Sequence, residues 1–135
     1  MNIATQQPQE LAEINAIEAW MMTMPQTQIA IEHHLHAGVY SRTAFVEENH
    51  AVCGVEICIA TQLITCGDVT AYTGNGEIRL TGYHVIDADA GRKTAFVAHS
   101  DSYITMFFST EATTIDEAER EFTREFERLQ TRVNQ

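Results

Sequence analysis

The feature that most constrains the fold is a run of short alternating segments between residues 38 and 110. Apolar and polar residues alternate within the segments, which is typical of strands that bury one face. Turns containing glycine separate the segments, as at Thr73-Gly74-Asn75-Gly76 and at Ala88-Asp89-Ala90-Gly91. Asn and Gly tolerate the positive φ angles of tight turns, so residues 73–76 predict a hairpin. Regularly spaced short strands predict a β-sandwich or a β-barrel.

The expected strands begin before this run. Residues 28–36 alternate, with Ile29 and Ile31 on one face and His34 and His36 on the other. The other expected strands are 39–47, 51–66 (as two strands or one bent strand), 69–73, 77–80, 82–86, 94–99 and 102–110. Gly67-Asp68 predicts a turn between two of them.

Residues 9–24 predict an N-terminal helix that ends before Pro25. Its apolar stripe, at steps of three and four, consists of Leu11, Ile14, Ile17 and Met21. Further apolar side chains near its end extend this surface, and the predicted oligomer contact is Trp20, Met21, Met22 and Met24. Packing of the same side chains on the barrel is the alternative. A dimer is the preferred oligomer.

Residues 113–135 predict a C-terminal helix. Thr114 and Glu117 have the spacing of a capping box, and an apolar stripe runs from Ile115 to Val133. Residues 1–8 are polar and predict a disordered tail. The chain of 135 residues is therefore expected to be a single domain, with a barrel over residues 25–112.

Charge limits the partners. The chain has 19 acidic and 8 basic residues and a net charge of −11. Binding to nucleic acid or to an anionic membrane requires clustered Lys and Arg, so both are disfavoured. A basic protein surface would suit this charge, and solubility alone is the alternative. The three cysteines form no CxxC motif, and residues 1–20 do not resemble a signal peptide, which predicts a cytoplasmic protein with free thiols.

Two stretches resemble small cupin-like proteins of bacterial and phage genomes. These are His33-His34-x-His36-Ala37-Gly38-Val39-Tyr40-Ser41-Arg42 and Ala88-Asp89-Ala90-Gly91-Arg92-Lys93-Thr94. The resemblance covers about residues 28–120 as short, scattered matches. It implies a mainly β fold, a cupin-like (jelly-roll) β-barrel flanked by an N-terminal and a C-terminal helix. It also implies a phage or mobile-element origin.

The metal motifs of the metal-binding cupins do not carry over to this sequence. Gly54 is in place, but Cys58 stands near the position of a histidine, Gln62 near a second ligand, and Phe107 near the final histidine. A metal site needs three or four converging N or O donors, so we expect no metal and no other cofactor there. His34 and His36 are the candidates for a separate zinc or nickel site. A polar surface strand is the other interpretation of that pair.

These observations favour a non-catalytic, acidic, cupin-like binding protein that acts through protein–protein contact, as an inhibitor of a host defence factor or as a virion accessory. The rival hypothesis is a small-molecule-binding or metal-dependent cupin enzyme that uses the barrel mouth. Its polar pocket lining would be Glu56, Gln62, Tyr72, His84 and Tyr103, with Phe107 plugging the space if it points inward. No nucleophile elbow or phosphate-binding loop is present.

Overall fold

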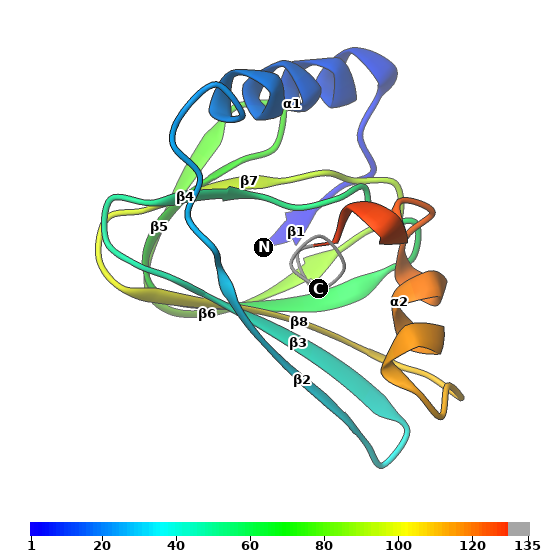
Figure 1. Cartoon of the computed structure of the whole chain (residues 1–135). Helices are drawn as coiled ribbons and strands as arrows, with labels where there is room; N and C mark the ends of the chain where they lie inside the picture. Colours follow the sequence, from blue (N-terminus) through cyan, green and yellow to red (C-terminus); the bar gives the residue numbers. More distant parts are fainter. Residues whose placement is uncertain (130–135) are drawn as a thin grey trace.

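The computed structural model describes residues 1–129 as a mainly β structure flanked by two helices (Figure 1). The strands are β1 (Asn2–Ile3), β2 (Ala30–His36), β3 (Val39–Val46), β4 (Ala51–Cys53), β5 (Thr61–Tyr72), β6 (Glu77–Ala88), β7 (Ala95–Ala98) and β8 (Ser102–Ser109). The helices are α1 (Pro8–Met21) and α2 (Ile115–Phe122), followed by a short 3₁₀ turn at Phe126–Arg128. The prediction of a mainly β barrel with a helix at each end is confirmed.

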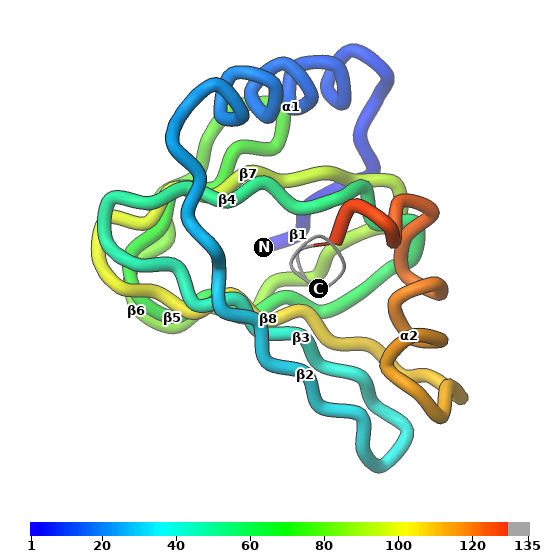
Figure 2. Tube along the Cα trace, in the orientation of Figure 1, coloured from blue at the N-terminus to red at the C-terminus, as the bar shows by residue number. Residues whose placement is uncertain are grey.

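Two long strands organise the barrel. β5 and β6 pair along their whole length, from Thr61↔Ala88 to Tyr72↔Glu77. The first half of β5 also pairs with β8, and its second half pairs with β7. One layer therefore has the order β1-β6-β5-β8-β3-β2, and the other continues from β5 through β7 to β4. Figure 2 shows the β2–β3 hairpin extending from this body near α2.

The core lies between the two layers. Its buried members include Tyr40, Leu63, Val69, Leu80, Ile86, Phe96, Ile104, Met106 and Phe108. These side chains alternate with outward-facing ones along their strands, as the period of two predicts. Gly67 lies inside β5 and not in a turn, which corrects the sequence-based expectation. Its φ is +137°, and a Cβ atom there would collide with Ser102, so the strand passes close to β8 only because this residue is glycine.

Residues 1–8 are not a disordered tail. Asn2 and Ile3 add a short parallel strand to β6, and Ile3 is buried. Gln6 is buried as well, and its side-chain amide donates to the carbonyl oxygens of Thr73 (2.6 Å) and Lys93 (2.7 Å). The Gln6 amide is buried with both of its N–H donors satisfied, so it anchors the segment. The polar composition of residues 1–8 does not indicate this anchor.

Helix α1 begins and ends close to the predicted limits. Pro8 occupies the first turn, and Gln7 and Glu10 form a capping box. The helix ends at Met21, three residues earlier than predicted. The Gln26 side chain donates to the carbonyl oxygens of Met21 and Met24, which replaces the next helical hydrogen bonds.

Helix α2 ends at Phe122. The sequence predicted one helix over residues 113–135, and this prediction is wrong for residues 123–129. Thr114 caps its start as predicted, because its hydroxyl accepts from the Glu117 amide. Thr123 is extended, and its hydroxyl donates to the Glu56 carbonyl oxygen, while the Cys58 amide donates to Phe122. These contacts with the loop before β5 turn the chain away. The rest of the predicted helix, residues 130–135, lies outside the described residues.

Candidate functional site

The residues predicted to line one pocket lie in different places. Gln62, Tyr103 and Phe107 are on the outer face of the β5–β8 sheet, where Gln62 donates to Asp87 (2.7 Å). Phe107 is half-buried, while its neighbours Met106 and Phe108 face the core. It therefore does not plug the barrel.

The other three members of that set are equally dispersed. Glu56 is exposed in the loop between β4 and β5, where its amide donates to the Glu125 carboxylate. His84 is half-buried on β6, and its ring lies 2.9 Å from the Thr81 carbonyl oxygen. Tyr72 lies at the end of β5 under helix α1. The six residues predicted to line one pocket therefore do not converge at the barrel mouth.

Metal-ligating side chains are also spread out. His34 and Glu32 approach within 3.2 Å on the exposed face of β2, and His36 lies two residues further along the same strand. Cys58 is half-buried, and its thiol donates to the Glu121 carbonyl oxygen. Among residues 1–129, no three His, Cys, Asp or Glu side chains are grouped as a metal ion would require. The chemistry of these donors does not fit a mononuclear cupin centre.

The barrel interior is filled with hydrocarbon. Leu63, Ile86, Ile104 and Met106 point inward and are at most 8% exposed. The hydroxyl of Thr65 is the one buried side-chain polar atom of the described residues without a hydrogen-bond partner. Two surface hollows of these residues lie outside the barrel. One hydroxyl cannot orient a small molecule, which usually needs several convergent polar groups.

A buried polar cluster that the sequence did not indicate lies under α2. Arg42 of β3 pairs with Glu119 at 3.1 Å, and His33 lies 2.7 Å from the Tyr40 hydroxyl. Burial, followed by the charge of Arg42, lowers the pKa of His33, and burial raises the pKa of Tyr40. Phe122 covers the cluster by stacking on Tyr40. This arrangement attaches α2 to β3.

The larger hollow is an open groove of about 560 Å³ between α1 and the β5–β6 hairpin. Ile17 and Trp20 from the helix and Tyr72 from the hairpin provide its apolar wall. Glu13 and Glu77 line it from opposite elements, and both are exposed. Burial and the charge of Glu77 raise the pKa of Tyr72, so its phenol stays neutral. The groove thus combines a large aromatic surface with two negative charges.

The turn of the hairpin positions this groove. Gly74 has a φ of +80°, and a Cβ atom at this residue would lie 2.5 Å from the Glu10 carbonyl oxygen. Only glycine allows the helix backbone to rest directly on the turn. Beneath the helix, Ile14 is fully buried. The Thr73-Gly74-Asn75-Gly76 motif therefore forms one wall of the groove as well as the predicted hairpin.

A buried lysine fixes the other side of α1. Lys93 is 2% exposed, and its ammonium donates to Asn15 and to Glu18, both at 2.9 Å. Arg128 also donates to Glu18, at 2.8 Å. Burial alone would raise the pKa of Glu18, but the hydrogen bonds from Lys93 and Arg128 outweigh it and lower this pKa. The Lys93–Glu18 ion pair holds α1, which carries Trp20, against the barrel.

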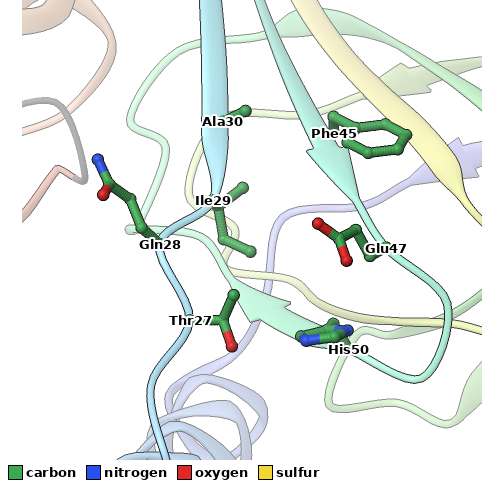
Figure 3. A pocket seen from close by; sticks show the side chains of 7 residues that line it. All are labelled: Thr27, Gln28, Ile29, Ala30, Phe45, Glu47 and His50. Atoms are coloured by element: carbon green, nitrogen blue, oxygen red, sulfur yellow. The ribbon is translucent and has the colours of Figure 1, made fainter.

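The smaller hollow, of about 50 Å³, lies beside the start of β2 (Figure 3). Ile29 and Ala30 lie on one side, and Glu47 and His50 lie on the other. This volume holds only a few water molecules. We therefore do not consider it a ligand site.

Trp20, Met22 and Met24, three of the four side chains predicted as an oligomer contact, are 49–64% exposed. Met21 is half-buried. The helix packs on the barrel mainly through Ile14 and the Lys93 contacts, so most of this apolar end remains uncovered. No helix within residues 1–129 is long and apolar enough to cross a membrane.

No family model and no curated protein matches this chain. Solved structures do match its fold. Ectoine synthase from P. lautus is 13% identical with a TM-score of 0.54, and the match covers 73% of this chain and 76% of that one. A cupin superfamily protein from Desulfitobacterium hafniense is 14% identical with a TM-score of 0.52, covering 82% and 97% of the two chains.

The cupin domain of an XRE family transcriptional regulator from Enterobacter cloacae is similar to the same degree. It is 5% identical with a TM-score of 0.51, and the match covers 63% of this chain and all of that domain. Such low identities establish the fold and leave the activity open. The chain has the cupin fold, which confirms the expectation from the sequence resemblance.

Proposed function

We propose that this protein is a non-catalytic binding protein in which the groove between α1 and the β5–β6 hairpin holds a basic segment of a partner protein. The observation that carries the proposal is the composition of the groove, with Trp20 and Tyr72 beside Glu13 and Glu77. A cationic side chain is attracted both by the face of an aromatic ring and by carboxylates.

The rest of the molecule supports this assignment. The chain has a net charge of −11, so a basic partner is attracted from a distance and steered to the surface. Within residues 1–129, His, Cys, Asp and Glu side chains are not grouped as a metal ion would require, and the barrel interior is packed. A rigid barrel therefore presents the groove and takes no part in a reaction. The proposed partner is a host nucleic-acid-binding defence factor or a virion component.

Trp20 provides a direct test, because it is the one tryptophan of the chain and lines the groove. We expect an arginine-rich peptide to change the Trp20 emission in a saturable titration at low salt, and a glutamate-rich peptide of equal length to leave it unchanged. The double variant Glu13→Gln/Glu77→Gln should weaken binding by about tenfold, which corresponds to two exposed charge pairs of about 0.7 kcal/mol each.

The matched control is Glu47→Gln/Glu48→Gln, which removes the same charge from exposed positions outside the groove. We expect this control to bind the peptide nearly as the unaltered chain does. Equal weakening in both double variants would show attraction by net charge alone and would refute the groove. An unchanged Trp20 emission at saturating peptide would refute it as well.

A further inference from the structure

The groove between α1 and the β5–β6 hairpin has an aromatic ring and a carboxylate on each of its two walls. On the helix wall, Glu13 and Trp20 are seven positions apart, so they lie on the same face of α1 and about 10 Å apart along its axis. On the hairpin wall, Tyr72 and Glu77 are register partners in adjacent strands, so their side chains lie next to one another. A ligand in the groove therefore meets a ring and an acid from both sides.

Small residues keep the space between the two walls open. Ala16 lies between Glu13 and Trp20 on the helix, and Gly74 and Gly76 lie on the hairpin. At Gly76, no atom lies within 4 Å of the position that a Cβ atom would take. A planar group fits against such flat surfaces over its whole area, which a tetrahedral ammonium group cannot do.

Trp20 presents its ring to solvent. The side chain is 64% exposed, so at least one face of the indole is uncovered. The face of a tryptophan ring attracts cations. Of the two common cationic side chains, arginine stacks on such a face as a weakly hydrated plane, whereas lysine keeps a strongly hydrated point charge. The exposed indole therefore favours arginine.

Elsewhere in the chain, the same pair of groups already holds an arginine. The Arg120 guanidinium lies 3.8 Å over the Phe126 ring, and its Nε donates to Asp116 at 2.9 Å. Arg120 is 55% exposed, so a ring and a carboxylate together order an arginine at a position open to water. Within residues 1–129, neither Glu13 nor Glu77 forms an ion pair, so both charges face the groove without a cation from this part of the chain.

We propose that the cation held in this groove is the guanidinium of an arginine side chain, which stacks on Trp20 and donates to a carboxylate of the groove. This assignment rests on the function proposed above and narrows it, because lysine and trimethyllysine carry the same charge as arginine. Lysine donates hydrogen bonds but does not stack as a plane. Trimethyllysine has no N–H group, so the two carboxylates gain less from it than from a guanidinium.

Fluorescence anisotropy of labelled oligopeptides tests the assignment at equal charge. The three peptides have equal length, the same label and the same terminal groups, and they consist of arginine, of lysine or of trimethyllysine. We expect the arginine peptide to bind the full chain with a dissociation constant about fivefold lower than either of the others. Stacking accounts for about two- to threefold of this difference, and a second hydrogen bond at an exposed site accounts for about twofold.

Substitutions of Trp20 separate stacking from charge. Trp20→Leu keeps the net charge and an apolar side chain but removes the ring, so the preference for arginine over lysine should fall to about twofold. Trp20→Phe keeps a ring face and should retain most of the preference. The matched control is Tyr83→Leu, which removes an aromatic ring of similar exposure, 65% against 64%, from outside the groove. This control should bind all three peptides as the unaltered chain does, and circular dichroism verifies that each variant is folded.

The possible results distinguish the arginine assignment from the groove itself. Equal dissociation constants for the arginine and lysine peptides would overturn the assignment and leave a groove that binds any cation. Tighter binding of the trimethyllysine peptide would overturn it too, as would an arginine preference that Trp20→Leu leaves unchanged. Binding of none of the three peptides would refute the groove and the assignment together.

Discussion

Replacement of Lys93 by methionine removes a buried charge that holds α1 in place. Lys93 is 2% exposed, and its ammonium donates to Glu18 and Asn15 at 2.9 Å. Methionine keeps most of the apolar stem and removes the three donors. Lys93→Met therefore isolates the ion pair from the packing of the side chain.

The magnitude follows from the partners that remain. Breaking a buried ion pair by removal of one partner costs about 3–5 kcal/mol. Glu18 retains Arg128 at 2.8 Å and is 17% exposed, so the remaining charge is partly compensated. We expect a loss of about 2–3 kcal/mol in the free energy of unfolding. For a domain of this size that loss corresponds to about 8–10 °C in Tm.

Urea unfolding measured by circular dichroism and by Trp20 fluorescence tests this value. The double variant Lys93→Met/Glu18→Gln should lose less stability than the sum of the two single variants, because the charges act on one another. A Lys93→Met variant within about 0.5 kcal/mol of the unaltered chain, as for a surface substitution, would refute the assignment of Lys93 as the anchor of α1.

Gly67→Ala should cost more than about 3 kcal/mol in urea unfolding, because strain at φ +137° adds to a collision with β8, whereas Gly82→Ala, at φ +85° with open space, should cost about 1 kcal/mol. Because the folded-state pKa of Glu18 is lowered, the ionised carboxylate contributes its full stabilisation above pH 4.5, the usual pKa, and this stabilisation is lost as pH falls through the lower folded-state pKa. Glu18→Gln should therefore flatten the acid side of a plot of Tm against pH. Burial, followed by the charge of Glu18, raises the pKa of the Cys53 thiol to about 12, so a thiol reagent at pH 8 should modify exposed Cys66 and spare Cys53 until the chain unfolds.

The alternation and turn chemistry of the sequence predicted a β-sandwich or a β-barrel, and the resemblance to cupin-like proteins selected the barrel. The hairpin at residues 73–76 and strands β7 and β8 were correctly predicted because their signals are local. Gly67 was misassigned because its role depends on Ser102, which lies 35 positions later in the chain and packs against it. Glycine preference alone does not distinguish a turn from a close approach of two strands.

The helical ends show the same limit. The Thr114 cap was predicted because it acts within one turn. The end of α2 at Phe122 depends on two hydrogen bonds to the loop before β5: the Thr123 hydroxyl donates to the Glu56 carbonyl oxygen, and the Cys58 amide donates to the Phe122 carbonyl oxygen. The apolar stripe in the sequence continues past Phe122 and does not indicate this end. Tertiary contacts override helix propensity here.

The candidate groove was not predictable as a site. Trp20 and Tyr72 were each identified from the sequence, one as an oligomer contact and the other as part of a barrel pocket. The structure brings them together because α1 rests on Gly74, a contact between residues far apart in the chain. Gln62, Tyr103 and Phe107 were assigned to the wrong face because the side that β5 and β8 turn to the core depends on how the two strands pair with each other and with their neighbours.

Elemental analysis combined with native mass spectrometry of the untagged protein tests the central claim, that this cupin fold binds a partner and catalyses no metal-dependent reaction. We predict less than stoichiometric transition metal and masses that match the bare chain and its dimer, including after incubation with zinc, iron or nickel followed by desalting. One tightly held transition metal ion per chain would contradict the account.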